Sequence, residues 1–124
     1  MTPRQIEQRI EQIKRRLAQV GPMHPGSIGK QYNVCGTPGC RCKDPQKPRK
    51  HGPYYQVSYV WQGKSSSRFV RPERIAAMRR KVSNYKRFRE RTNEWVGLAV
   101  ELEQAERAQL SQIGRGRRKQ SDGD

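Results

Sequence analysis

The sequence predicts a small, metal-stabilised α+β domain with an N-terminal helix, a loop of metal-ligating residues, a β-hairpin and a long C-terminal helix. Three observations predict this fold class. Apolar residues recur at helical spacing near both ends, a run of aromatic and β-branched residues precedes a glycine-containing turn, and all three cysteines lie close together. Only 31% of the 124 residues are hydrophobic, against roughly 45–50% in typical domains. We therefore expect a zinc ion, a partner or a long helical packing seam to supplement a small core.

Residues 1–21 are predicted to form the N-terminal helix. Thr2 has the side chain of an N-cap, Pro3 suits the first helical position, and Gln5 can complete a capping box. Apolar residues follow at alternating intervals of four and three, forming a coiled-coil-like seam: Ile6, Ile10, Ile13, Leu17 and Val20. Gly21 ends the pattern. Because a helix of this length is marginal alone, the seam is expected to pack on another element.

Residues 22–72 are predicted to hold a cysteine- and histidine-rich loop and a hairpin. Cys35, Cys40, Cys42 and His51 have the spacing Cys-x4-Cys-x-Cys-x8-His. Zn²⁺ takes four thiolate and imidazole ligands in tetrahedral geometry, and the glycines and prolines between these residues allow the tight turns that such a site needs. The four residues therefore predict a zinc-stabilised loop, in which a full ligand shell makes the zinc structural.

Two alternatives stay open for this loop. The three cysteines can be reduced thiols without a metal, with His51 serving only as the residue that enters the hairpin. His24, eleven residues before Cys35, is a second and weaker candidate for the fourth ligand.

The hairpin is predicted from two β-type runs, residues 54–61 and 65–70, around a turn that contains Gly63. In the first run, alternate residues share one face: Tyr55, Val57, Tyr59 and Trp61. Because a two-stranded hairpin is barely stable by itself, this face is expected to need support from another element.

Residues 73–110 are predicted to form one long helix, followed by a basic, flexible tail over residues 111–124. The apolar stripe of this helix shifts by three residues near Phe88, which indicates a stammer or a change of packing partner, and Gly97 is a point where the helix can bend. The second half of the helix is acidic, the N-terminal helix is basic, and both carry apolar seams. We therefore expect the two helices to pack together, within one chain or between two.

Short motifs over residues 26–85 resemble a family of small prokaryotic proteins without an assigned activity. The motifs are Gly26-Ser27, the run CGTPGCRC from Cys35, the run HGPYY from His51, Gly63-Lys64, and Arg68 with Val70. The shared pattern is CGxxGCxC followed by HGPYY, a hairpin and a helix. The resemblance implies a compact Cys/His unit from a mobile-element or phage setting. The first helix and the basic loop over residues 44–50 are expected to be particular to this member.

The chain carries 27 Lys and Arg against 11 Asp and Glu, a net charge of +16. Such a charge repels itself unless an anion screens it. Basic residues interleaved with aromatic ones favour a nucleic-acid surface over a membrane anchor. The residues expected to contact DNA or RNA are Arg41, Lys43, Lys47, Arg49, Lys50, Tyr54, Lys64, Arg68, Arg79, Arg80, Arg87 and Arg91. Tyr54, Tyr55 and Trp61 are expected either to stack on unpaired bases or to form the hairpin's own core.

The sequence thus favours a nucleic-acid-binding accessory protein. The alternative is an interaction scaffold whose helical seams bind a protein partner or a second copy of the chain. An enzyme is not expected, because the sequence has no catalytic motif, no phosphate-binding loop and no glutamate between the zinc ligands. A cytoplasmic protein is expected, because there is no membrane-spanning run or signal sequence, and an odd number of cysteines favours a reducing compartment.

Overall fold

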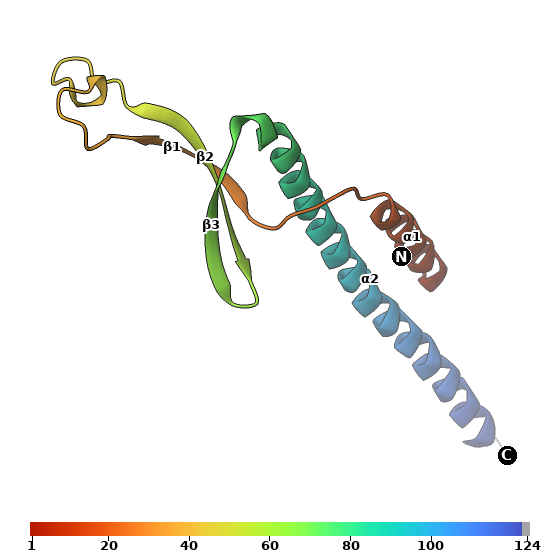
Figure 1. The fold of residues 1–124 in the computed structure, drawn as a ribbon. Helices are drawn as coiled ribbons and strands as arrows, with labels where there is room; N and C mark the ends of the chain where they lie inside the picture. The colour runs from red at the N-terminus through yellow and green to blue at the C-terminus, as the bar shows by residue number, and fades with distance from the viewer. Residues whose placement is uncertain (123–124) are drawn as a thin grey trace. The chain divides into compact units, whose positions relative to one another are not determined.

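The structure is a computed structural model that describes the backbone of residues 1–122 and the side chains of residues 1–113. The elements, in chain order, are α1 (Pro3–Ala18), β1 (Ser27–Asn33), the 3₁₀ helix η1 (Arg41–Lys43), β2 (His51–Trp61), β3 (Lys64–Val70), the 3₁₀ helix η2 (Pro72–Arg74) and α2 (Ile75–Asp122) (Figure 1). The predicted α+β class is confirmed.

The chain forms two compact units, each described by itself. The helical unit consists of Met1–Val20 and the chain from Arg87 onward, and the sheet unit consists of Gly21–Lys86. Helix α2 therefore contributes to both units. The predicted shift of its apolar stripe near Phe88 falls next to this boundary, which fits the predicted change of packing partner.

The helical unit contains the packing that the two apolar seams predict. Ile6, Ile10 and Ile13 of α1 are buried together with Leu98 of α2. Half-buried residues extend this cluster along both helices: Leu17, Trp95, Leu102 and Ala105. The predicted capping box is present, because the Thr2 side chain accepts from the N–H of Gln5 and the Gln5 side chain accepts from the N–H of Thr2.

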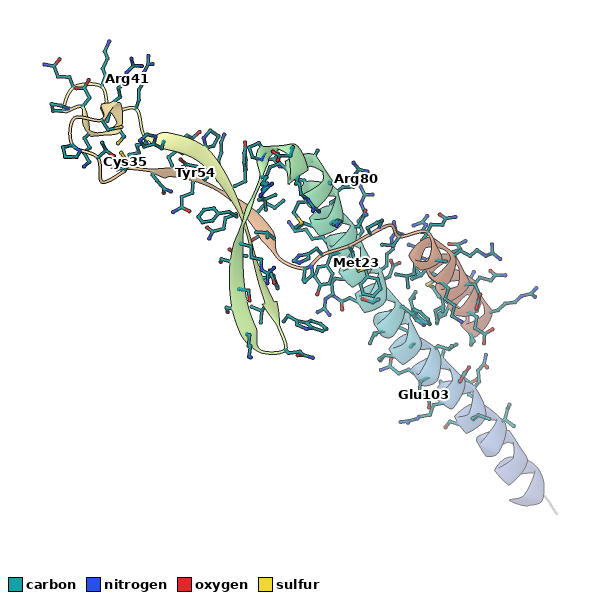
Figure 2. All side chains as sticks on the ribbon, viewed as in Figure 1. Met23, Cys35, Arg41, Tyr54, Arg80 and Glu103 are labelled. Carbon is teal, nitrogen blue, oxygen red and sulfur yellow. The ribbon has the colours of Figure 1, made fainter. Side chains whose placement is uncertain are left out.

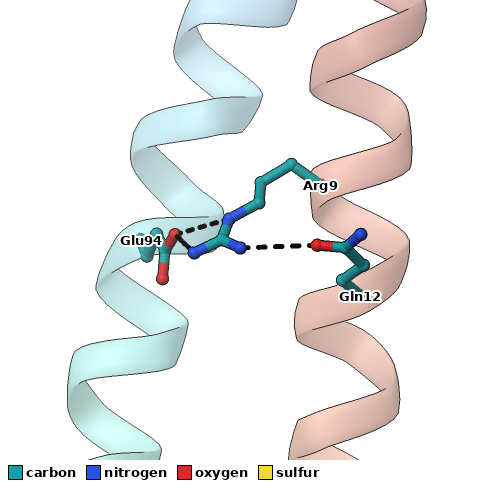
Figure 3. Close-up of polar contacts among 3 residues, drawn as sticks. All are labelled: Arg9, Gln12 and Glu94. Atoms are coloured by element: carbon teal, nitrogen blue, oxygen red, sulfur yellow. Dashed lines mark hydrogen bonds and ion pairs between the residues drawn. The ribbon is translucent and has the colours of Figure 1, made fainter.

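One ion pair of the helical unit joins the basic α1 to the acidic half of α2. Nε and Nη2 of Arg9 donate to Oε1 of Glu94 at 3.0 and 2.8 Å, and Nη1 of Arg9 donates to Oε1 of Gln12 at 3.4 Å (Figure 3). The Arg9 and Glu94 side chains remain 38% and 42% exposed. Solvent therefore screens the pair, and the buried isoleucines supply most of the stabilisation.

The sheet unit has three antiparallel strands in the order β1-β2-β3, so the prediction of a two-stranded hairpin is incomplete. Strand β1 lies in a segment predicted to be loop. It is an edge strand in which only Ile28 and Asn33 are partly shielded from solvent. An edge strand with so little burial carries no clear alternation of apolar and polar residues, so its sequence pattern did not indicate a strand.

One face of the sheet packs on the first turns of α2, within the sheet unit. Val57 and Val82 are buried, the Arg79 guanidinium lies 5.5 Å from the Tyr55 ring centre, and His24 meets Tyr59 edge-on with the ring centres 4.7 Å apart. Tyr55 and Tyr59 thus belong to the packing of the unit. Trp61, predicted to share their face, is 65% exposed because it ends β2 at the hairpin turn.

Helix α2 differs from its predicted bounds at both ends. Its first turn is the 3₁₀ helix Pro72–Arg74, and the α-helix runs from Ile75 to Asp122. Residues 111–122 of the predicted tail are thus helical, and no proline in this stretch interrupts the backbone hydrogen bonds. The last two residues of the predicted tail lie outside the described residues. No helix in the described part of the chain is long and apolar enough to cross a membrane.

The first prediction concerns the docking of α1. Ile13 is 1% exposed, so the substitution Ile13→Ala removes buried methyl groups and is expected to lower the free energy of unfolding by about 2–5 kcal/mol. Glu94→Gln breaks a screened ion pair and is expected to cost less than about 1 kcal/mol. Denaturant unfolding followed by circular dichroism measures both variants. A larger loss for Glu94→Gln than for Ile13→Ala would contradict this account.

Candidate metal centre

The pairing of β1 with β2 brings the first and last of the predicted metal ligands together. The ladder runs from Ser27 opposite Ser58 to Asn33 opposite His51. Cys35 follows β1 by two residues and His51 opens β2, so the loop between the strands closes on itself. The candidate metal centre therefore lies at this end of the sheet, where Figure 2 labels Cys35 and Arg41 in the same loop.

Two turns within the loop position the other two cysteines. The N–H of Cys40 donates to the carbonyl of Thr37 at 3.4 Å, closing the turn that contains Pro38 and Gly39. The N–H of Lys43 donates to the carbonyl of Cys40 at 3.0 Å and begins η1. This 3₁₀ turn directs Cys42 back toward Cys35, and Cys42 is the buried member of the cluster. The Gly/Pro-rich spacing thus has the turning role predicted for it.

The four predicted ligand atoms converge. The three thiol sulfurs and one ring nitrogen of His51 all lie within 4.8 Å of one another. Cys35 Sγ is 3.5 Å from Cys42 Sγ, and Cys40 Sγ is 3.2 Å from His51 Nε2. In a tetrahedral site with metal–sulfur bonds of 2.3 Å, neighbouring sulfurs are about 3.8 Å apart. The spacing therefore fits one shared metal ion, and all three cysteines are free thiols.

Hydrogen bonds and burial shift the pKa of every group in the cluster. The backbone N–H of Thr37, followed by the neighbouring thiols, lowers the pKa of Cys35 to about 6. The backbone N–H of Cys42 lowers the pKa of Cys40. Burial raises the pKa of the Cys42 thiol, and hydrogen bonds to Cys35 and Cys40 raise the pKa of His51. Cys35 therefore favours the thiolate form at neutral pH.

Gly52 allows His51 to sit beside the cysteines. Its φ is +133°, and a Cβ there would lie 2.8 Å from the carbonyl oxygen of Gln31 on β1. A side chain at this position would thus push β2 away from β1 next to the ligand. The HGPYY motif by itself does not indicate this role for Gly52, because the role depends on the pairing with strand β1, which the sequence pattern does not indicate.

His24 is not part of the convergent group, so the alternative fourth ligand is not supported. Its Nδ1 lies 2.7 Å from the carbonyl of Pro25, its backbone N–H donates to the carbonyl of Lys81 at 3.1 Å, and its ring contacts Tyr59. Each of these contacts belongs to the packing of the sheet unit rather than to a metal site.

Ten of the twelve predicted nucleic-acid contacts lie in the sheet unit. The five cations of the Cys/His loop are all exposed: Arg41, Lys43, Lys47, Arg49 and Lys50. Tyr54 on β2, Lys64 and Arg68 on β3, and Arg79 and Arg80 on α2 are also exposed. Arg87 and Arg91 belong to the helical unit. Arg79 contacts the Tyr55 ring and so has a packing role as well.

The chain belongs to the family of the domain of unknown function DUF6788, whose family model matches residues 3–80. The match covers α1, the sheet, the Cys/His loop and the first turns of α2, and it confirms the predicted family-level relationship. It also includes the first helix and the basic loop, which the resemblance had left out as particular to this member. No curated protein and no solved structure matches the chain.

The second prediction concerns metal content. Full-length protein is expected to carry about one tightly bound metal ion per chain, and Cys40→Ser is expected to abolish its retention because it removes one of four ligands. Elemental analysis after dialysis measures the content. His24→Gln is the matched control, since His24 lies outside the cluster, and it should retain the metal. Equal metal content in Cys40→Ser and wild type would contradict the assignment.

The third prediction concerns the pH dependence of thiol reactivity in metal-free protein. A lowered pKa keeps Cys35 ionised as the pH falls, until the pH approaches about 6. The alkylation rate of Cys35 should therefore reach half its maximum near that pH, whereas Cys42, whose pKa is raised, should need alkaline pH. Iodoacetamide labelling with peptide mass spectrometry resolves the two sites. One shared alkaline midpoint for both thiols would count against the described geometry.

Proposed function

We propose that this DUF6788 protein binds nucleic acid through its sheet unit, with Zn²⁺ as a structural ion in the Cys/His loop. The observation that carries the proposal is the segregation of charge. The sheet unit, Gly21–Lys86, holds fourteen Lys and Arg against two acidic residues, a net charge of +12, whereas the rest of the chain accounts for +4. A compact unit with this excess is expected to recruit a polyanion.

The cations of the sheet unit, all of whose residues the structure describes, also form no ion pairs with acidic side chains. Among the side chains that the structure describes, all three ion pairs lie in the helical unit: Arg9–Glu94, Lys14–Glu11 and Arg107–Glu103. The two acidic residues of the sheet unit are Asp44 in the Cys/His loop and Glu73 in η2. Unpaired and exposed cations can replace the counterions of a phosphate backbone, which is the main source of sequence-independent affinity.

Zinc is the metal that the donor set favours. Three soft thiolates and one imidazole suit Zn²⁺ better than the oxygen-preferring Mg²⁺ or Ca²⁺. Binding replaces up to three thiol protons and leaves a formally singly negative centre within a loop of five cations and one acidic residue. Four protein ligands leave no position for a substrate or water, so the proposed role of zinc is structural and no catalytic role is assigned to it.

A second candidate function is a protein-interaction scaffold, favoured by one observation. On the part of α2 that belongs to the helical unit, several large apolar side chains are exposed: Val96 at 63%, Val100 at 54%, Leu110 at 69% and Ile113 at 54%. Exposed apolar side chains of this kind can bind a partner helix or a second copy of the chain. A stable monomer that binds naked nucleic acid favours the first proposal, and a co-purifying protein with weak nucleic-acid binding favours the second.

The fourth prediction tests the electrostatic contact. Replacing Lys47, Arg49 and Lys50 with Gln removes three exposed charges from the Cys/His loop. Wild-type affinity for a generic duplex should fall steeply with salt, and the triple variant should bind more weakly, with the slope of log K against log salt reduced by about 2 to 3. Fluorescence anisotropy across a salt series measures both quantities.

The matched control removes three charges from the other unit, by replacing Arg4, Arg15 and Arg16 of α1 with Gln. Both triple variants lower the net charge equally. Equal losses of affinity would therefore show that only total charge matters, and wild-type binding that does not respond to salt would overturn the proposal.

A further inference from the structure

We infer that the solvent-exposed face of the sheet is a stacking platform for single-stranded nucleic acid, on which Tyr54 and Phe69 each receive an unpaired base. The inference rests on the proposed function, because it identifies the part of the sheet unit that contacts bases rather than phosphates.

The platform is the face opposite to the one that packs on α2. Side chains alternate between the two faces of a strand, and Val57, which is 2% exposed, marks the covered face. Tyr54 lies three residues before Val57 and therefore points to the opposite face. Phe69 pairs with Gln56 and shares that opposite face. Phe69 is 69% exposed and Tyr54 is 43% exposed, so neither aromatic ring is used to build the core.

Strand pairing places each ring beside an amide side chain. Gln56 of β2 lies opposite Phe69 of β3 and opposite Gly29 of β1. In the neighbouring row, Tyr54 lies opposite Gln31. The two rows are two residues apart along β2, which is about 7 Å. Each row thus offers an aromatic surface for a base to stack on and an amide that can hydrogen-bond the edge of the same base.

Apart from Val60 near the hairpin turn, the rest of this face is polar, and it lacks negative charge. Ser58 and Ser67 form a hydroxyl pair with oxygens 3.0 Å apart, one row from Phe69. None of the three strands contains an Asp or Glu. Contiguous exposed apolar patches mark protein-docking surfaces, whereas isolated rings separated by amides and hydroxyls suit bases on a flexible, negatively charged backbone. The surface therefore favours single-stranded nucleic acid over a protein.

The platform adjoins the cations of the Cys/His loop. Tyr54 follows the metal ligand His51 by three residues, and Figure 2 labels Tyr54 on the strand that leads out of the loop carrying Arg41. Lys50 and Arg49 immediately precede β2. A single-stranded nucleic acid whose bases stack on the sheet can therefore place its phosphates against the Cys/His loop. The two surfaces thus form one continuous site.

The fifth prediction tests stacking separately from charge. The probes are an unstructured pyrimidine oligonucleotide, as RNA and as DNA, and a duplex of the same length, all bound to zinc-loaded full-length protein. Phe69→Leu keeps an apolar side chain but removes the ring, and it should weaken single-strand binding by about 5- to 100-fold. Tyr54→Leu should act in the same direction. Neither should change duplex affinity or the salt slope, because neither removes a charge.

Two controls exclude a merely structural effect. Phe69→Tyr restores an aromatic ring and should bind within about twofold of wild type. Val60→Ala trims a non-aromatic residue of the same face, which is 61% exposed and pairs with Ser65 near the hairpin turn, and should leave binding unchanged because it removes no ring. Metal content and thermal unfolding are measured for each variant. A larger loss of affinity for the RNA oligonucleotide than for the DNA oligonucleotide would identify RNA as the natural ligand.

The outcomes separate this inference from the proposed function. Wild-type binding that Phe69→Leu and Tyr54→Leu leave intact would overturn the platform while the electrostatic contact stands. Loss of duplex binding in parallel with single-strand binding would also overturn it, since duplex bases cannot stack on the rings. Absence of binding to every probe at low salt would overturn both proposals.

Discussion

The antiparallel pairing of β1 with β2 is the interaction on which the candidate site depends. These strands bring together the two ends of the connection that carries the cysteines, and the ladder stops at His51, itself a candidate metal ligand. Closing such a loop costs conformational entropy, and β1 is an exposed edge strand that buries little surface to offset it. A metal shared by both ends of the loop would supply the missing free energy. The strand pairing and the metal centre therefore support each other.

The two units of the chain differ in their balance of acidic and basic residues. The helical unit interleaves acidic and basic residues, packs an isoleucine seam against Leu98, and holds the ion pairs that the structure describes. The sheet unit has little acidic charge and a small core centred on Val57 and Val82. Self-repulsion lowers the stability of such a unit, and a bound anion relieves it. The fold of the sheet unit and its proposed ligand are thus energetically linked.

Helix α2 packs against different partners along its length. Its first turns cover one face of the sheet, and its later turns form the α1 seam. The apolar stripe changes phase near Phe88 because the side chains on either side of that point pack against different partners. This division leaves the other face of the sheet uncovered, which is why Phe69 and Tyr54 remain exposed and available to a ligand.

The sequence by itself determined the features that local chemistry specifies: the capping box at Thr2, the α1 seam with the acidic part of α2 as its packing partner, and the four candidate metal ligands. Helical periodicity, capping and metal-ligand spacing are short-range patterns. Only the tertiary structure decided that Ser27–Asn33 is a strand, that Gly52 must lack a side chain, and that Phe69 faces solvent while Tyr55 does not. These features depend on the pairing of the strands and on the face of the sheet that α2 covers. The sequence of an exposed edge strand does not indicate such long-range contacts.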